Sequence, residues 1–173
     1  MFTRLRRLLP VLALATLAAA LGVSPAATAG ETRPPQLSTD RPDARPPVPR
    51  QPSKGERAAR IALEVVGIPY RWGGESPSGG FDCSGLVRWA YGRVGVDLPH
   101  NSYALYSVGR RIPRDDMEIG DVLFFEGLGH VGLYLGQGRM VHAPQTGRNV
   151  EVVRLATTTY GSRLIGARRM ASA

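Results

Sequence analysis

Three side chains of this sequence have the chemistry of acyl transfer: Cys83, His130 and His142. Cys83 is the only cysteine of the 173 residues, so it cannot form a disulfide within the chain. A single thiol can instead be a small buried hydrophobic group, a bridge to a second chain or a nucleophile. The two histidines favour the nucleophile, because one imidazole can act as its general base and the other can orient that base.

The residues that follow Cys83 predict the element that positions it. Apolar side chains recur three, four, seven, eight and eleven residues further on, which is one stripe of an amphipathic helix ending near Gly95. A glycine-rich loop over 70–80 leads into this helix. The unpaired N–H groups and the positive dipole end at a helix start stabilise a thiolate, so we expect the pKa of the Cys83 thiol to be lowered. The same N–H groups can receive an oxyanion.

Helices are expected in the first half of the folded part and strands in the second half. Helical patterns cover 55–66 and 83–95, and Asn101 or Ser102 can cap a third helix that reaches Val108. Turn residues then separate five short β-forming runs, at 121–125, 130–135, 139–143, 150–153 and 163–167. This order predicts an α+β fold in which the helices pack on an antiparallel sheet of about five strands.

Alternation along the expected strands brings the two histidines together. His130, Gly132 and Tyr134 share one face of their strand, and a turn over 136–138 returns the chain toward His142. A hairpin at this turn places both imidazoles on one face, where the small Gly132 leaves room for another side chain. We therefore expect the two histidines to face the cysteine at the start of its helix.

Residues 1–29 have the three parts of a secretory signal peptide. Arginines precede an apolar run over 8–22, and Ala27-Thr28-Ala29 offers a small-residue cleavage site. The apolar run is shorter than the roughly 20 residues that span a bilayer. No cysteine stands at the cleavage site, so a lipoprotein anchor is not expected. We expect a secreted protein, extracellular or held at the cell wall, without a stable membrane anchor; an uncleaved anchor is the alternative.

Residues 30–54 are rich in proline and nearly free of large apolar side chains. Such a composition cannot bury enough surface to fold, which predicts a disordered, extended linker. The alternative is an inhibitory segment that lies across the active site, which nothing in the composition favours. Residues 55–173 remain as one folded domain, which we expect to be monomeric.

The charge of the chain bears on its partners. The formal net charge is +8, and loss of the first 29 residues removes three of the 22 basic residues and none of the 14 acidic ones. A basic exported protein is attracted to anionic wall polymers or phospholipid headgroups. Nucleic acid is not an expected partner, because the arginine pairs at 110–111 and 168–169 are scattered and no helix has a basic face.

Six motifs, in order and spacing, resemble the NlpC-type cell-wall cysteine peptidases. They are Tyr70-x-Trp72-Gly73-Gly74, Phe81-Asp82-Cys83-Ser84-Gly85-Leu86-Val87, Leu98-Pro99, Gly120-Asp121-Val122-Leu123-Phe124-Phe125, His130-Val131-Gly132-Leu133-Tyr134-Leu135-Gly136 and Met140-Val141-His142-Ala143-Pro144. The resemblance covers about residues 55–170. It implies a papain-like fold and hydrolysis of amide bonds in peptidoglycan stem peptides, usually between D-isoglutamate and the diamino acid at the third position.

The resemblance also implies a role for each residue of the catalytic centre. Cys83 matches the family's nucleophile, His130 its general base and His142 the polar residue that orients the base. Tyr70 matches a tyrosine that lines the oxyanion region. With these roles we expect acyl transfer through a thioester, begun by a Cys83 thiolate paired with a protonated His130.

Substrate contacts are implied in the same way. Asp82 and Ser84 match positions that contact the stem peptide in relatives, and Trp72 could border the groove, although a core position is more usual for tryptophan. The sequence departs from the family after Pro99, where His100 stands in a stretch in which many members have arginine and threonine. We expect His100 to be solvated or at the rim, outside the site.

Other functions fit the sequence less well. Zinc binding by Cys83, His130 and His142 lacks the close pair of ligands with which such sites usually begin, so we expect no metal and no other cofactor. A wall-binding module with a decayed site conflicts with three filled catalytic positions. A related papain-like amidase or acyltransferase, acting on another cell-envelope substrate with the same triad, stays open as the alternative function.

Overall fold

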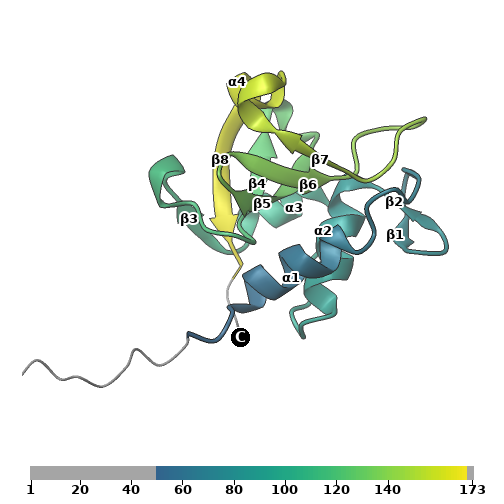
Figure 1. The fold of residues 1–173 in the computed structure, drawn as a ribbon, viewed down its shortest axis with the longest axis horizontal. Coiled ribbons are helices and arrows are strands. Elements are labelled where there is room, and N and C mark those ends of the chain that lie inside the picture. Colours follow the sequence, from purple (N-terminus) through teal and green to yellow (C-terminus); the bar gives the residue numbers. More distant parts are fainter. Residues whose placement is uncertain (1–49, 171–173) are drawn as a thin grey trace, which may run out of the picture. The chain divides into compact units, whose positions relative to one another are not determined.

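The computed structural model of the chain describes residues 50–170. The predicted signal peptide and the predicted linker up to residue 49 lie outside the described residues. Figure 1 shows the described helices and strands, which are α1 (Lys54–Leu63), β1 (Glu75–Ser76), β2 (Gly80–Phe81), α2 (Cys83–Gly92), α3 (Ser102–Ser107), β3 (Arg110–Ile112), β4 (Val122–Phe125), β5 (Val131–Gly136), β6 (Arg139–His142), β7 (Glu151–Arg154), α4 (Tyr160–Arg163) and β8 (Leu164–Arg169). Helices come first and most strands later, as predicted for an α+β fold.

Helix α1 begins with a capping box. Ser53 Oγ accepts a hydrogen bond from the Glu56 N–H at 3.1 Å, and the Glu56 carboxylate accepts one from the Ser53 N–H at 2.6 Å. The helix buries three alanines, whose small side chains allow α1 to pack closely against α2. It ends at Leu63, three residues before the end that the sequence pattern predicted.

Within residues 50–170, the main sheet has six antiparallel strands in the order β3-β8-β4-β5-β6-β7. The five predicted strands are present as β4 to β8. Strand β3 was not predicted, because three residues that include two arginines show no apolar alternation; it pairs with β8, Arg110 lying opposite Arg169. The short pair β1–β2 was also missed, since it lies in the glycine-rich loop before α2.

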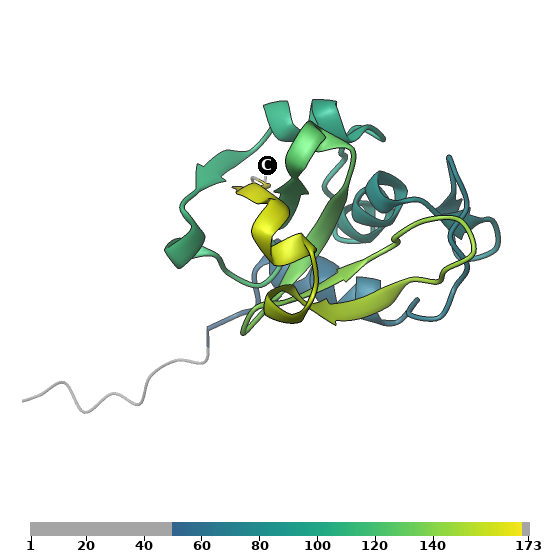
Figure 2. The same cartoon turned by 90° about the horizontal axis from the view of Figure 1, so that it is seen from above.

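Both faces of this sheet are covered, as Figures 1 and 2 show. Helices α1 and α2 pack on one face, where Val122 and Phe124 join the larger core. On the other face Leu123 and Phe125 join a smaller core with Tyr160 of α4. Alternate residues of β4 therefore point into different cores, which explains why this strand reads as a continuous apolar run.

The predicted hairpin joins β5 to β6 and brings the start of β5 beside the end of β6. Leu133 pairs with Val141, and the turn residues Gly136, Gln137 and Gly138 have φ of 82°, 53° and 67°. Glycine adopts such positive φ without strain. Helix α2 packs on β5, so the elements that carry the cysteine and the two histidines meet at one place.

Candidate active site

Cys83 is the first residue of α2, as the sequence predicted. Asp82 caps this helix, because its Oδ1 accepts hydrogen bonds from the Gly85 N–H at 2.7 Å and from the Ser84 hydroxyl at 3.1 Å. The thiol is free and partly buried. The backbone N–H of Val131, at the start of β5, is close enough to the sulfur to favour its ionised form.

The pKa of the Cys83 thiol does not shift as the sequence predicted. Burial raises this pKa above its ordinary value, and the negative charge of Asp82 acts in the same direction. The N–H groups of Val131 and of the helix start lower the pKa, but they do not outweigh the lost solvation. The prediction of a lowered pKa is therefore wrong, and in the free site the sulfur keeps its proton at neutral pH.

His130 and His142 meet as the predicted hairpin requires. His130 immediately precedes β5 and His142 ends β6, and Nε2 of His130 lies 2.8 Å from Nδ1 of His142. The rings cross at 81°, and the His142 side chain has no exposed surface. Nδ1 of His130 is then the nitrogen that remains available to the Cys83 thiol.

Both imidazoles are uncharged at neutral pH. Burial lowers the pKa of His130 to about 3, and electrostatic interactions with the neighbouring His142 and with Arg163 act in the same direction. Burial likewise lowers the pKa of His142 to about 4, with a further contribution from Arg148. A thiolate–imidazolium pair is therefore not the resting state, which corrects the pairing of Cys83 and His130 expected from the sequence.

Cys83 and His130 line one open cleft of about 500 Å³. Most of the other residues predicted for the site line it too, namely Tyr70, Trp72, Asp82 and Ser84. His142 is not part of the lining and lies behind His130. Trp72 is 89% exposed, so it stands at the rim of the cleft and not in the core.

The loop over 70–74 is pressed against the first turn of α2. The Asp82 N–H donates to the Gly74 carbonyl at 2.9 Å. A side chain at Gly85 would collide with the same carbonyl, so this close approach requires glycine. The contact holds Tyr70 at the cleft, where burial and then neighbouring negative charges raise the pKa of its phenol. The phenol therefore stays protonated and can donate a hydrogen bond.

His100 contacts residues of the site, although it was expected to be solvated or at the rim and was left out of the predicted site. Its Nε2 lies 2.9 and 3.0 Å from the two oxygens of Asp82, and its Nδ1 lies 3.3 Å from the Glu75 carboxylate. Arg88 pairs with the same carboxylate of Glu75. The imidazole also lines the cleft. The available signal was its position after Pro99, where many members of the family have arginine, because both side chains can bind carboxylates.

Tyr160 is another residue of the site that the sequence analysis missed. Its ring stacks on His130 with 5.2 Å between centroids and meets His142 edge-on at 4.8 Å. Phe125 also packs against His130, at 5.7 Å. These rings keep water from both imidazoles, which is the main cause of their lowered pKa values. No local pattern connects a tyrosine of the short helix α4 with the histidines.

The two imidazoles are not arranged to share a metal ion. Their facing nitrogens are 2.8 Å apart, which is a hydrogen-bond distance and leaves no space for an ion between them. In the part of the chain that the structure describes, no group of three or more His, Cys, Asp or Glu side chains is placed to hold a metal. The arrangement is that of two imidazoles joined by a hydrogen bond.

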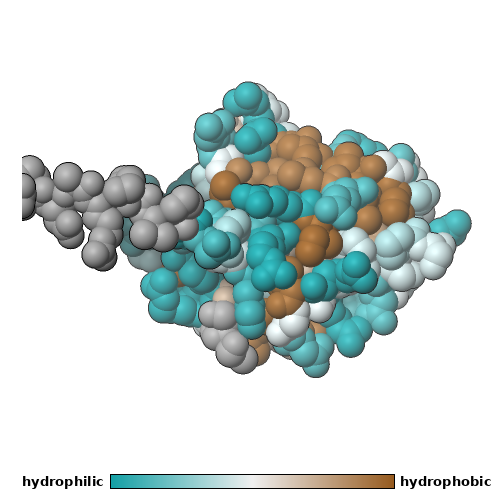
Figure 3. Space-filling view, turned by 60° about the horizontal axis from the view of Figure 1, so that its bottom comes forward, coloured by the Kyte–Doolittle hydropathy of each residue, from teal (hydrophilic) through white to brown (hydrophobic). Residues whose placement is uncertain are grey.

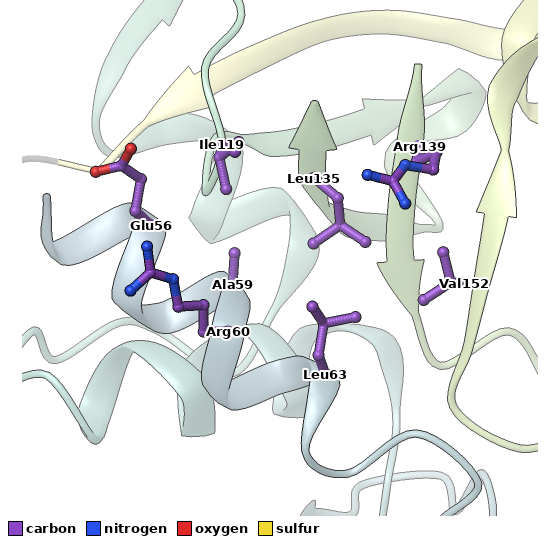
Figure 4. A pocket seen from close by; sticks show the side chains of 8 residues that line it. All are labelled: Glu56, Ala59, Arg60, Leu63, Ile119, Leu135, Arg139 and Val152. Atoms are coloured by element: carbon purple, nitrogen blue, oxygen red, sulfur yellow. The ribbon is translucent and has the colours of Figure 1, made fainter. Parts of the chain in front are cut away.

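A second cavity, of about 200 Å³, lies between α1 and the sheet (Figure 4). Side chains of α1, of the loop before β4 and of β5, β6 and β7 point into it. Leu63, Ile119 and Val152 contribute exposed apolar surface there, and Figure 3 shows a face of the molecule on which apolar side chains gather. The lining contains neither cysteine nor histidine, so the Cys83 cleft is the candidate active site.

Comparison with known proteins identifies relatives of this domain. Residues 67–169 match the NlpC/P60 family. A probable endopeptidase of Mycobacterium tuberculosis is 49% identical over 102 residues, which are 57% of this chain and 26% of that protein. The gamma-D-glutamyl-L-lysine dipeptidyl-peptidase of Bacillus subtilis is 40% identical over 129 residues, which are 71% of this chain and 43% of that protein. The chain therefore spans less than half the length of these relatives.

A solved relative has the same fold. A mutated form of RipA, the resuscitation promoting factor interacting protein, aligns with a TM-score of 0.60 and 36% identity, over 68% of this chain and 62% of that chain. RipA has been solved in forms mutated at a cysteine, at a histidine and at a glutamate. The alignment confirms the papain-like α+β fold that the sequence resemblance implied.

Proposed function

The chain belongs to the NlpC/P60 family, and from that membership and the geometry of the cleft we propose that it is a cysteine-type peptidoglycan hydrolase. Its substrates are the stem peptides of the cell wall, and the Cys83 sulfur attacks the scissile amide. The observation that carries the proposal is that Cys83 and His130 line one open cleft while His142 contacts His130 from behind.

The names of the relatives support this reaction class. The Bacillus subtilis relative is a gamma-D-glutamyl-L-lysine dipeptidyl-peptidase, and RipA is named a peptidoglycan endopeptidase. The histidine and the glutamate mutated in RipA are 12 residues apart, as are His130 and His142. This spacing supports His142 as the orienting residue, at a position where RipA has a carboxylate.

The first half of the reaction starts from a neutral site. As the Cys83 sulfur attacks the carbonyl carbon, its proton moves to Nδ1 of His130. The C–S bond forms, the carbonyl π electrons move to oxygen, and N–H groups at the start of α2 stabilise the oxyanion together with the Tyr70 phenol. When the oxyanion collapses, the C–N bond breaks and the departing amine takes the proton from His130. A thioester remains on Cys83.

In the second half, water hydrolyses this thioester. His130 takes one proton from the water as its oxygen attacks the acyl carbon, and the C–S bond then breaks. The proton passes to the departing sulfur, which regenerates the thiol, and the peptide leaves as a carboxylic acid. His142 accepts a hydrogen bond from His130 in both halves and so holds the ring in place.

We propose the bond between D-isoglutamate and the diamino acid as the target. This assignment rests on the family resemblance and on the gamma-D-glutamyl linkage in the name of the Bacillus subtilis relative. Asp82, Ser84 and Trp72 are the predicted contacts of the stem peptide, and all three line the cleft. The exposed indole of Trp72 is available to pack against a bound peptide.

Product analysis tests the proposal. The chain without residues 1–29 is incubated with isolated peptidoglycan and defined muropeptides, and the products are identified by mass spectrometry. We expect fragments that end in D-isoglutamate and fragments with a free amine on the diamino acid, and none with Cys83→Ala. Cleavage at a cross-link, release of ammonia or transfer to an amine would replace this assignment with another endopeptidase, an amidase or an acyltransferase. No product at all would overturn the proposal.

We also propose that the protein is exported and acts in the cell wall. The signal-peptide pattern of residues 1–29 supports export, and the formal net charge of +5 that remains after the three arginines of this segment are removed favours contact with anionic wall polymers. Among residues 50–170, no helix has the length and apolar character to cross a bilayer. Sequencing the N-terminus of protein from culture and wall fractions tests this proposal. We expect a start at Gly30; an intact Met1 in the membrane fraction would contradict it.

A further inference from the structure

One ring nitrogen of His142 has no hydrogen bond. Its Nδ1 faces His130 at 2.8 Å, whereas its Nε2 is fully buried and finds no hydrogen-bond partner among the described residues 50–170. The His142 side chain has no exposed surface. A buried polar atom without a hydrogen bond raises the free energy of the folded chain. We therefore expect a group that can come within hydrogen-bond distance of this nitrogen when substrate is bound.

Glu151 is placed to be that partner. Strands β6 and β7 pair antiparallel with His142 directly opposite Glu151, so both side chains lie on one face of the sheet. Oε1 of Glu151 is 3.5 Å from Nε2 of His142, slightly longer than a good hydrogen bond. Nη2 of Arg148 lies 2.8 and 2.6 Å from the two carboxylate oxygens and restrains them at this position.

An acceptor at this place decides where both imidazoles carry their protons. A neutral imidazole has one N–H and one lone pair, and an ionised carboxylate only accepts. If Nε2 of His142 donates to Glu151, Nδ1 of His142 accepts from Nε2 of His130, and Nδ1 of His130 keeps the lone pair. In the reverse arrangement a lone pair of His142 faces the carboxylate, and Nδ1 of His130 carries a proton. His130 could not then take the proton of the Cys83 thiol.

We propose that Glu151 is a fourth, positioning residue of the site, whose carboxylate accepts the Nε2 proton of His142 and so selects the tautomers in which His130 is a base. Its effect on catalysis rests on the proposed function, but the tautomer of His142 does not depend on any activity. Glu151 does not line the Cys83 cleft, so it acts through the two imidazoles and not on the substrate.

Nitrogen-15 NMR of the imidazoles tests the tautomers directly. The chain has only three histidines, and His100→Gln removes the signals of the third for assignment. We expect His142 and His130 to be protonated at Nε2 in the chain without residues 1–29. Glu151→Leu removes the acceptor and is expected to shift His142 toward the Nδ1–H form. Glu151→Gln keeps an amide oxygen that can accept, so it should retain the original tautomers.

Kinetics give the second readout. Glu151→Leu should lower kcat by about 10-fold to 100-fold with KM little changed, the usual size for loss of an outer hydrogen-bond partner. Glu151→Gln should recover most of this loss. Glu118→Gln is the matched control, because it also removes a carboxylate from an arginine ion pair, at Arg169, and should leave kcat unchanged.

The outcomes separate this proposal from the proposed function. If the wild-type chain shows the expected tautomers but cleaves no peptidoglycan, the proposed function fails and the role of Glu151 in setting the tautomer stands. If Glu151→Leu keeps both the tautomers and the kcat of the wild type, Glu151 has no positioning role. Should circular dichroism show that the leucine variant is unfolded, Glu151→Val, which suits a strand, replaces it under the same criteria.

Discussion

Two groups of side chains meet at Cys83, and they differ in charge and in contact with water. On one side His130 and His142 are buried and uncharged beneath the ring of Tyr160. On the other side Asp82 and His100 form a hydrogen-bonded polar group that reaches the surface, with 23% of the His100 side chain exposed. The first group can transfer a proton in a place that is shielded from water. The second group can form hydrogen bonds with a polar substrate that enters the cleft.

This difference also explains the state of the thiol. Burial and the charge of Asp82 both raise the pKa of Cys83, and the helix N–H groups only reduce the shift. In the proposed mechanism the reactive thiolate is therefore produced during the attack, by transfer of the proton to a neutral His130. The helix N-terminus alone does not lower the pKa of this thiol below its ordinary value, so the proposed mechanism assigns its activation to the buried imidazoles.

The largest loss of activity is expected from substitution of Cys83, the residue at which the two groups meet. Cys83→Ala removes the nucleophile, and Cys83→Ser replaces the thiol with a hydroxyl, which is a weaker acid and is harder for the same base to activate. Both variants should release no muropeptides by mass spectrometry while keeping the circular dichroism spectrum of the wild type. Release near the wild-type rate by Cys83→Ala would end the thiol mechanism.

The next largest effect is expected among the buried imidazoles. His130→Ala should lose nearly as much kcat as Cys83→Ala, because a nucleophile and its base act as a unit. His142→Gln should retain more activity than His142→Ala, since its amide oxygen can still accept from Nε2 of His130. Equal and total loss in both His142 variants would show that this residue does more than orient the base.

The buried imidazoles should also make the fold sensitive to acid. The pKa of His130 is about 3 and that of His142 about 4 in the folded chain, against an ordinary 6.5 when unfolded. The unfolded chain therefore binds more protons in this window, so stability is complete above pH 6.5 and falls as the pH decreases toward 4. Each histidine contributes at most about 1.4 kcal/mol per pH unit.

Urea denaturation across this pH window measures the effect. His142→Gln removes one of the two buried histidines and should reduce the dependence of the unfolding free energy on pH. A wild-type chain whose stability is constant through the window would contradict the burial of uncharged imidazoles.

A smaller effect, on KM and not on kcat, is expected from substitutions in the polar group of Asp82 and His100. His100→Ala removes a partner from Asp82, but Gly85 and Ser84 still donate to that carboxylate and keep α2 capped. We therefore expect KM to rise by about 2-fold to 10-fold, the size of one lost hydrogen bond, with kcat little changed. His100→Arg can still bind the carboxylate and should restore KM. A loss confined to kcat would place His100 with the base.

The sequence predicted the positions of those site residues that a single helix or a single hairpin places. The helical stripe after Cys83 placed the thiol at a helix start, and alternation around the turn at 136–138 brought His130 to His142. The roles of these residues in catalysis stay predictions. The positions of these three residues could be predicted because one helix places the cysteine and one hairpin places the two histidines.

Contacts between distant segments were beyond the reach of the sequence. Tyr160 reaches the imidazoles only because the chain returns from β7 to β8, and His100 reaches Asp82 only because the loop after α2 folds back onto the helix start. The direction of the Cys83 pKa shift was also missed, because it depends on how much solvent the whole fold removes from the sulfur.

The smallest effect is expected from the segment that precedes the domain. If residues 30–49 are a linker, removing them should leave kcat/KM on soluble muropeptides unchanged. The shortened chain should begin at Arg50, because Arg50 pairs with Glu56 at 2.8 Å and Ser53 caps α1.

A start at Gly55 would remove that cap and cost about 0.5–2 kcal/mol, which an activity assay would confuse with lost function. With the cap retained, the long and short chains differ only in the proline-rich segment, and one assay compares them. A severalfold gain on removal of residues 30–49 would show that the segment covers the Cys83 cleft and that the protein is made as an inactive precursor. The segment has almost no large apolar side chains with which to hold such a position, so we expect no gain.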